Sequence, residues 1–441
     1  MIQRRQFLLR TAAGFGAVIL PTLSLAQDLP TPIGATAVTQ VFGDGLRFIA
    51  VALEFETPVD GSTLTAKEYA VEGRTVTEVY TATTADPSTR AESGQFVIVL
   101  LSPDDDTASL LEGSGQQGEG GSPLGGGQGG PSGPSGGPGH AGDIPNYSKN
   151  YLDPSAIVDQ TDGTTTQTTA TLNLIVDEFE QFEFTDADTG YVLPYNLFTP
   201  KDNDPAQAYP LVLFMHDAGV TNDVTRTTLF QGVGALVWAA PEEQAKRPSY
   251  VLAPQYPDII ADDASNTSDA LDATIKLIEH LGETYNIDAG RRYTTGQSGG
   301  CMMSIAMNIK YPDFFAATYL VAGQWAPELV APMAGNNIWI LVSENDGKAY
   351  PGQIAITEAL ETAGATVSRA VWSARWTANQ FQFAFDDIDA EGSAINFVTY
   401  ADGTVFADGE TNTGGGAGHT ATWQTAYNIE PIREWLFRHS L

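Results

Sequence analysis

The pattern of apolar residues changes once along this chain of 441 residues, at about residue 174. Before that point the apolar segments are short, rich in Val, Ile, Phe and Thr, and separated by turn residues such as Gly43-Asp44-Gly45. After it, short strands of the buried type alternate with segments whose apolar residues recur at helical spacing. Such a chain is predicted to fold into a small all-β domain followed by an α/β domain.

The first of these domains is predicted to be a small β-sandwich that spans residues 27–172. Its apolar segments follow one another at the short spacing typical of sandwich domains. They are Thr36–Phe42, Leu46–Phe55, Arg74–Tyr80 and Phe96–Leu101, with a further strand expected over Ala170–Val176. No cluster of catalytic residue types occurs here, so we expect this domain to pack, orient or bind rather than to perform chemistry.

A stretch rich in glycine and proline interrupts this domain between residues 113 and 142. It holds 15 of the 45 glycines and keeps no apolar periodicity, which is typical of flexible linkers and loops. Because a strand is expected after it, we interpret the stretch as an insertion rather than a domain boundary. His140 lies within it and is expected to be solvated and without function.

The remainder of the chain, residues 173–441, is predicted to be an α/β domain whose mostly parallel sheet is flanked by helices. Strands are expected at Pro210–Met215, Tyr250–Ala253, Arg292–Thr295, Ala316–Val321, Ile338–Ser343 and Ile395–Tyr400. Helices are expected from Ser268, as N-cap, to Tyr285 and over Cys301–Lys310, Ile356–Ala363 and Ile429–Arg438.

The first 26 residues have the features of an export signal rather than of a folded segment. They contain Arg4, Arg5 and Arg10 and no acidic group, followed by an apolar run that is too short for a membrane span of about 20 residues. The segment Arg4-Arg5-Gln6-Phe7-Leu8 resembles a twin-arginine signal, and an ordinary secretory signal is the alternative. We therefore expect a periplasmic or secreted protein with no membrane span after the signal is removed.

The charge and the cysteine count exclude several classes of partner and site. With 21 basic and 54 acidic residues the formal net charge is −33, which would repel nucleic acid and anionic membrane surfaces. A single cysteine excludes an internal disulfide and a multi-cysteine metal site. No cluster of metal ligands and no phosphate-binding loop is visible, so we expect no cofactor and no metal. The oligomeric state stays open.

The segment with the clearest chemical meaning is Tyr293-Thr294-Thr295-Gly296-Gln297-Ser298-Gly299-Gly300. It places a Gly-x-Ser-x-Gly pattern between a predicted strand and a predicted helix, which is the context of a nucleophile elbow. The glycines permit close approach of strand and helix, and the helix N-terminus offers N–H groups to a developing oxyanion. Ser298 is therefore the predicted nucleophile, and a plain strand-to-helix turn is the alternative.

A serine nucleophile needs a base, and the chain has five histidines. His280 falls on the outer part of a predicted helix, His439 lies near the C-terminus, and His216 follows a strand upstream of Ser298. His419 lies in a predicted glycine-rich loop between the last strand and the last helix. By elimination and by the chain order serine, acid, histidine, His419 is the predicted base.

The acid that orients this base is expected after a strand between Ser298 and His419. The strand Ile338–Ser343 ends in Glu344-Asn345-Asp346-Gly347, so Asp346 lies just beyond a carboxyl end. Its expected role is to hold the imidazole tautomer and stabilise the imidazolium. Glu344 is the close rival of Asp346, and Asp386 or Asp387 is a distant one.

The oxyanion is expected to be bound by two backbone N–H groups. The segment Met215-His216-Asp217-Ala218-Gly219 follows the first core strand directly. We predict the N–H groups of Ala218 and Gly299 as the pair, with Asp217 as the alternative to Ala218. His216 is then a structural residue rather than a catalytic one.

Aromatic residues near the predicted site are candidates for a substrate-binding wall. Trp325 and, more weakly, Trp423 are predicted to bind substrate, and Trp372 and Trp376 are further candidates; each is more often a core residue. Cys301 follows the elbow and is more simply explained as a small buried packing residue than as a reactive thiol.

The chain resembles a known family through several stretches. They are Val38–Gly45, Arg74–Tyr80, Tyr209–Gly219, Val251–Gln255, Ile287–Gly300, Tyr311–Ala317, His419–Tyr427 and Glu434–Phe437. In these it is similar to α/β-hydrolase esterases with an N-terminal immunoglobulin-like domain, near polyhydroxyalkanoate-depolymerase-type and "predicted peptidase" sequences. The resemblance implies an α/β-hydrolase fold behind an immunoglobulin-like sandwich, and an esterase triad of Ser298, Asp346 and His419.

Two departures from the family pattern weaken any inference about substrate. Asp217 stands where such proteins usually have glycine in His-Gly-Ala-Gly, and Ser298-Gly299-Gly300-Cys301 stands where they usually have Ser-Met-Gly-Gly. Both changes keep the backbone donors. The predicted activity is hydrolysis of small or polymeric carboxylic esters through an acyl-enzyme. The alternatives are a polyester depolymerase, a serine peptidase and a non-catalytic binding protein on a hydrolase fold.

Overall fold

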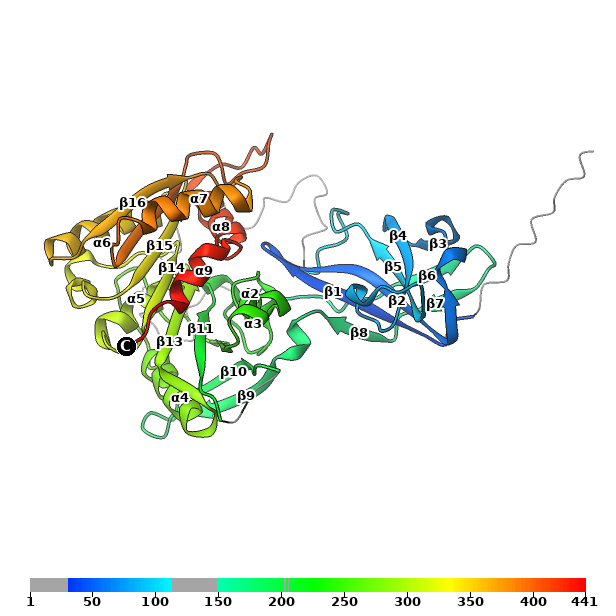
Figure 1. The fold of residues 1–441 in the computed structure, drawn as a ribbon, viewed down its shortest axis with the longest axis horizontal. Coiled ribbons are helices and arrows are strands. Elements are labelled where there is room, and N and C mark those ends of the chain that lie inside the picture. The colour runs from blue at the N-terminus through cyan, green and yellow to red at the C-terminus, as the bar shows by residue number, and fades with distance from the viewer. Residues whose placement is uncertain (1–30, 113–148, 202–203, 205) are drawn as a thin grey trace, which may run out of the picture.

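The computed structural model describes residues 31–112, 149–201, 204 and 206–441. The predicted export signal, residues 1–26, and the glycine-rich stretch, residues 113–142 with His140, lie outside the described residues. Two groups of sheets follow each other along the long axis of the molecule (Figure 1). We call residues 31–112 and 149–173 the sandwich domain, and residues 180–441 the α/β domain.

The sandwich domain is built from one sheet of five strands and one of three. The larger sheet has the order β4-β5-β2-β1-β8 and the smaller one the order β3-β6-β7. Their bounds are β1 Gly34–Phe42, β2 Gly45–Asp60, β3 Tyr69–Val71, β4 Val76–Ala82, β5 Ser93–Leu101, β6 Ile157–Gln160, β7 Thr165–Gln167 and β8 Ala170–Asn173. Alternate side chains on the large sheet, such as Val51 and Leu53, share a buried cluster with Val71 and Val158 of the small one.

The β1–β2 hairpin carries the sandwich domain toward the α/β domain. These strands pair antiparallel from Gly34 opposite Glu54 to Phe42 opposite Gly45. The hairpin extends toward helix α8, Gly415–Ala426, in Figure 1. At its tip a Cβ on Gly43 would overlap the backbone of Gln424, so the two backbones are in direct contact there. Only glycine fits such an approach.

The α/β domain contains a sheet of nine strands in the order β16-β17-β15-β14-β13-β11-β12-β10-β9. The pairs from β16 to β12 are parallel, and β10 pairs antiparallel with both β12 and β9. The strands are β9 Glu180–Thr185, β10 Val192–Phe198, β11 Tyr209–Met215, β12 Tyr250–Pro254, β13 Ile287–Gln297, β14 Ala317–Val321, β15 Ile338–Ser343, β16 Val367–Trp372 and β17 Ile395–Tyr400. The sheet is mostly parallel, which confirms the predicted α/β fold class for this domain.

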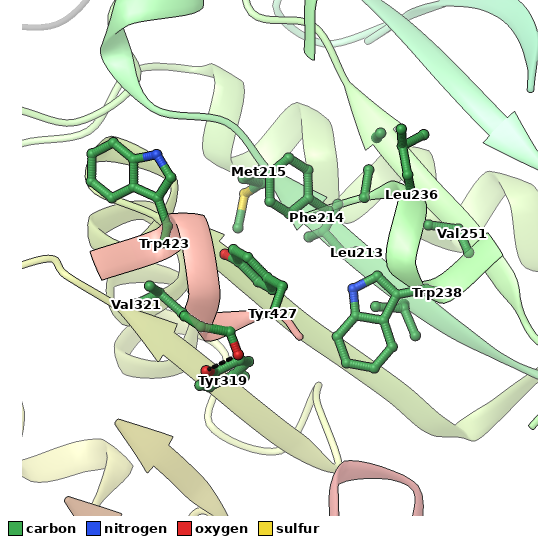
Figure 2. Packing of buried hydrophobic residues seen from close by; sticks show 14 of the residues in the cluster. Leu213, Phe214, Met215, Leu236, Trp238, Val251, Tyr319, Val321, Trp423 and Tyr427 are labelled. Carbon is green, nitrogen blue, oxygen red and sulfur yellow. Dashed lines mark hydrogen bonds between the residues drawn. The ribbon is translucent and has the colours of Figure 1, made fainter. Parts of the chain in front are cut away.

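Helices flank this sheet. They are α1 Thr227–Phe230, α2 Leu236–Ala239, α3 Pro241–Lys246, α4 Ala270–Thr284, α5 Gly299–Lys310, α6 Ala349–Thr362, α7 Ala378–Asp389, α8 Gly415–Ala426 and α9 Glu430–Phe437. Figure 2 shows Tyr427, at the end of α8, beside Phe214 of β11 and Tyr319 of β14; the ring centroids lie 5.8 and 5.7 Å from that of Tyr427. Among the described residues no helix is long and apolar enough to cross a bilayer.

Several elements differ from those predicted. Helix α4 begins at Ala270, and Asp269 is its N-cap residue by position. The predicted N-cap, Ser268, lies one residue earlier, and its Oγ accepts a hydrogen bond from the N–H of Ala270 at 3.4 Å. The predicted loop around His419 is helix α8, because close packing compensates for the low helix propensity of its glycines. The pair β9–β10 was missed, since it lies at the antiparallel edge of the sheet and carries a weak pattern.

Candidate active site

Ser298 lies on a tight turn between strand β13 and helix α5. Its φ of 51° and ψ of −114° put a non-glycine residue in a strained conformation. The neighbouring backbone packs closely enough to hold it: a Cβ on Gly296 would overlap Gly300, and a Cβ on Gly300 would overlap Met215 O. The turn therefore places Ser298 at the carboxyl end of strand β13, directly before helix α5.

His419 faces Ser298 from the first turn and a half of α8. Its Nε2 lies 2.9 Å from Ser298 Oγ, and its Nδ1 lies 2.5 Å from Asp346 Oδ2. The residue before it, Gly418, permits this approach, since a Cβ there would lie 2.5 Å from Asn345 O. One imidazole thus bridges the serine hydroxyl and the carboxylate.

Asp346 is 1% exposed and is held by the loop after strand β15. Its Oδ1 accepts hydrogen bonds from the backbone N–H groups of Lys348, at 3.0 Å, and Ala349, at 2.8 Å. These donors fix the carboxylate so that Oδ2 accepts the Nδ1–H of His419 and leaves Nε2 free to accept a proton from Ser298.

The rival acids have other partners. Glu344 accepts hydrogen bonds from Thr399 Oγ1 and from the N–H of Asp402 beyond strand β17. Asp386 and Asp387 lie on helix α7, where Asp386 accepts a hydrogen bond from Gln382. The carboxylate beside the imidazole of His419 is that of Asp346.

The backbone around Ala218 and Gly299 forms the other side of the site. Ala218 N lies 3.5 Å from the point where a Cβ of Gly299 would be, so the two predicted oxyanion donors are neighbours. No acceptor within the described parts of the chain takes a hydrogen bond from either N–H. Two unpaired donors at the end of a helix and beside a nucleophile are suited to a developing negative charge.

His216 binds through its ring to this loop and to the segment after strand β12. Its Nδ1–H donates to Asp217 O at 2.7 Å, and its Nε2 accepts from the N–H of Tyr256 at 2.9 Å. Burial lowers the pKa of His216, so the ring is held neutral in one tautomer. This arrangement agrees with the structural role predicted for it.

The candidate binding residues are almost fully buried. Trp423 is 6% and Trp325 7% exposed, and the Trp423 ring packs edge-on against His419 with centroids 4.9 Å apart. Trp423 therefore supports the imidazole, while substrate binding by either residue stays a prediction. Cys301 is buried, and burial raises the pKa of its thiol to about 12, which fits a packing role.

The remaining described histidines lie away from Ser298. His280 of α4 is exposed and packs against Phe184, at 5.6 Å between ring centroids. His439 packs against Trp435, at 4.3 Å, beyond helix α9, and burial lowers its pKa.

A buried polar network behind the oxyanion donors was missed from the sequence. Gln297 Nε2 donates to Asp217 Oδ2 at 3.0 Å and to Gln231 Oε1 at 3.1 Å. Gln255 Nε2 donates to Val220 O at 2.8 Å. Gln297 occupies a variable position of the Gly-x-Ser-x-Gly pattern, so the pattern does not predict its role. The one signal in the sequence is the charged Asp217 just after a buried strand, because a buried charge needs polar partners.

Comparison with known proteins identifies the first domain. Residues 34–173 match the family model described as the esterase Ig-like N-terminal domain. The crystal structure of a thermostable esterase superposes with a TM-score of 0.73 at 25% identity, and the match covers 93% of this chain and all of that one. The chain resembles Ig-like-domain esterases. The resemblance predicted from the sequence is thus confirmed, and the second domain has the α/β-hydrolase fold.

A curated relative agrees with this over a shorter stretch. Ethyl acetate hydrolase from Pseudomonas putida is 34% identical over 126 residues, which are 27% of this chain. The match spans about a third, 35%, of the length of that hydrolase. Both relatives are named as enzymes that cleave esters, which supports the prediction of a carboxylic ester hydrolase.

Proposed function

We propose that this protein is a serine esterase that hydrolyses carboxylic esters through an acyl-enzyme. Ser298 is the nucleophile, His419 the general base and Asp346 the residue that orients the base. The observation that carries the proposal is the unbroken line of hydrogen bonds from Asp346 through His419 to Ser298, of 2.5 and 2.9 Å. This line meets the geometric requirement for activating a serine hydroxyl.

The reaction follows from these positions. Ser298 Oγ attacks the ester carbonyl carbon while its proton passes to His419 Nε2, and the carbonyl oxygen becomes an oxyanion bound by the N–H groups of Ala218 and Gly299. When this tetrahedral intermediate collapses, the bond between its central carbon and the alcohol oxygen breaks, and the leaving alcohol takes the proton from His419. Water then attacks the acyl-serine carbonyl carbon and gives a proton to His419. When this second intermediate collapses, the bond to Ser298 Oγ breaks, Oγ takes the proton back from His419, and the carboxylic acid leaves.

The relatives favour an ester rather than a peptide as substrate. The names ethyl acetate hydrolase and thermostable esterase both describe ester cleavage, and the first points to a short acyl group. Polymeric esters and peptides are the other substrates to test. An amine is a poorer leaving group than an alkoxide, so we expect the same triad to cleave esters faster than peptides.

The assay measures turnover of p-nitrophenyl esters from acetate to laurate, beside polyester film and casein. We expect turnover of the short esters, and a loss of about 10⁶-fold in kcat for Ser298→Ala. Ser88→Ala, at an exposed position of the sandwich domain, is the matched control and should keep full activity. Absence of ester turnover in the wild-type protein contradicts the proposal, and retained activity in Ser298→Ala contradicts the nucleophile. A preference for casein would indicate a serine peptidase instead, and a preference for polyester film would indicate a polyester depolymerase.

We further propose that residues 1–26 direct export through the twin-arginine route to the periplasm or the medium. The support is the sequence alone: paired Arg4 and Arg5 before an apolar run. Replacing both arginines by lysine should leave the full-length precursor in the cytoplasmic fraction. Export of the doubly substituted protein at the wild-type level would favour an ordinary secretory signal.

A further inference from the structure

Asp217 is a buried carboxylate beside the proposed oxyanion donors, in a loop we call the oxyanion loop, residues 216–220. Its Oδ1 accepts a hydrogen bond from Gly219 N at 2.7 Å, and its Oδ2 accepts one from Gln297 Nε2 at 3.0 Å. Gln297 directly precedes Ser298. One carboxylate therefore ties the loop that carries Ala218 to the elbow that carries Ser298 and Gly299.

A buried carboxylate is costly unless a positive charge and hydrogen bonds compensate for it. Burial raises the pKa of Asp217, but its neighbours together outweigh this, the charge of Lys149 first and the hydrogen bond from Gln297 second, so the pKa lies below its usual range. The ionisable groups that face Asp217 are Lys149, His216, Tyr151 and Tyr427.

Among these groups Lys149 is the one that supplies positive charge. Burial lowers the pKa of His216 and raises those of Tyr151 and Tyr427, so these three stay neutral at neutral pH. The position of Lys149 fits this role. If Gly219 carried a Cβ, Asp217 Oδ1 would lie 2.7 Å and Lys149 Nζ 3.8 Å from it, so the two charged groups flank Gly219.

Lys149 belongs to the sandwich domain, although it contacts the oxyanion loop. The segment that follows it pairs with the end of that domain: the N–H of Leu152 donates to Leu110 O at 2.8 Å, and the N–H of Glu112 donates to Asn150 O at 2.9 Å. The N–H of Lys149 itself donates to Gly219 O at 3.3 Å. The sandwich domain thus reaches the oxyanion loop with both a backbone bond and a charge.

We infer that Lys149 is a positioning residue through which the sandwich domain fixes the oxyanion loop. Its ammonium group keeps Asp217 ionised, and the ionised carboxylate holds Gly219 and Gln297. The N–H groups of Ala218 and Gly299 are thereby kept pointing at the same position. Lys149 does not touch the substrate. The inference rests on the proposed function, since it concerns stabilisation of an oxyanion.

Loss of this charge has a specific consequence. Without Lys149 the pKa of Asp217 rises, because less neighbouring charge then opposes the effect of burial. Asp217 binds a proton at a higher pH than in the wild type, and once protonated it loses its charge-assisted hydrogen bonds to Gln297 and Gly219. The N–H groups of Ala218 and Gly299 are then no longer held in a fixed position relative to each other. Because these donors matter most when negative charge develops, the effect falls on kcat rather than on KM.

The experiment is a double-mutant cycle with p-nitrophenyl acetate, measured as kcat and KM across the pH range. Lys149→Met keeps the alkyl chain and removes the charge, Lys149→Arg restores the charge, and Asp217→Asn removes the group through which it acts. Lys67→Met, at an exposed position of the sandwich domain, is the matched control.

We expect Lys149→Met to lower kcat about tenfold with KM within about twofold of wild type, while Lys149→Arg and Lys67→Met keep most of the activity. In Lys149→Met, Asp217 should bind its proton at a higher pH than in the wild type. The ratio of wild-type kcat to Lys149→Met kcat should therefore be larger at about pH 5 than at about pH 8. In the Asp217→Asn background, Lys149→Met should change kcat less than about twofold.

Three results would overturn the inference alone: an equal loss in the Asp217→Asn background, a loss confined to KM, or full activity of Lys149→Met. An inactive wild-type enzyme would instead overturn the proposed function, and the inference with it. If Asp217→Asn does not fold, as judged by its thermal transition, the pH dependence of Lys149→Met decides. A kcat loss that is independent of pH counts against the inference.

Discussion

The two sides of Ser298 are supported in different ways. On the base side, His419 and Asp346 both belong to the α/β domain, and the imidazole is fixed by the carboxylate and by the ring of Trp423. On the oxyanion side, Asp217 depends on the charge of Lys149, which the sandwich domain supplies. One side is complete within a single domain, while the other needs both.

The sandwich domain also touches the base side, but through an uncharged contact. Gly43, at the tip of the β1–β2 hairpin, lies against the backbone of Gln424, five residues beyond His419. A neutral backbone contact stabilises the docking of a domain without setting the charge of a catalytic group. We therefore expect the sandwich domain to influence the catalytic rate through Lys149 and the stability of the fold through Gly43.

The largest effect is expected from breaking the base side at Asp346. Asp346→Asn places an amide beside His419 Nδ1 and favours the wrong tautomer, so kcat should fall about 10⁴-fold while the fold is kept. Steady-state kinetics with p-nitrophenyl acetate, beside a circular dichroism spectrum, checks this. Glu344→Gln is the matched control, since Glu344 bonds to Thr399 and Asp402 instead. A larger loss of kcat in Glu344→Gln than in Asp346→Asn would mean that Glu344, not Asp346, orients His419.

A smaller loss is expected when the approach of helix α8 is blocked. In Gly418→Ala the added Cβ would lie 2.5 Å from Asn345 O, so the helix must move away from the loop that carries Asp346. A displacement of His419 by about 1 Å should lower kcat roughly 10²-fold. Gly416→Ala is the control in the same helix, because a Cβ on Gly416 meets no atom within 4 Å.

Gly416→Ala should keep its activity and gain up to about 1 kcal/mol of stability from helix propensity. Equal kcat values for the two variants would mean that the close contact at Gly418 does not position His419. The comparison uses kcat and the thermal transition of each variant under the same conditions.

Much of the base side could be predicted because its signals are local. Ser298 stands in a pattern with a known structural context, Asp346 follows a strand, and elimination among five histidines leaves His419. The helix around His419 could not be predicted, since Gly415 and Gly418 argue against a helix when read alone. They are required because the helix packs against Gly347 and Asn345, which is a tertiary contact.

The oxyanion side was only half predictable. The sequence places Ala218 and Gly299 as backbone donors, and the unusual Asp217 is visible as a departure from the family pattern. Its partner Lys149 lies in another domain, next to a segment without periodicity, and no local pattern joins the two. Charge compensation of a buried group depends on tertiary structure, so a single sequence does not reveal it.

The neutral contact of the sandwich domain is tested by Gly43→Ala. A Cβ at this position would overlap Gln424, so the hairpin tip should be displaced from α8 with a loss of about 1–3 kcal/mol in stability. We expect kcat to change less than about threefold, since Asp346 and Trp423 still hold His419. Gly335→Ala, where a Cβ meets no atom within 4 Å, is the control. A kcat loss as large as that of Lys149→Met would remove the distinction between the two contacts.

The smallest effect is expected at the far end of helix α8, where Tyr319 OH donates to Ala426 O at 3.0 Å. Tyr319→Phe removes this bond, but the N–H of Ile429 still donates to the same carbonyl at 3.4 Å, so no buried acceptor is left unpaired. The free energy of unfolding, measured by urea titration, should fall by about 1 kcal/mol, with kcat unchanged. Because His419 is held by Asp346 at the other end of the helix, a clear loss of kcat would mean that the base side depends on the whole helix rather than on its first turns.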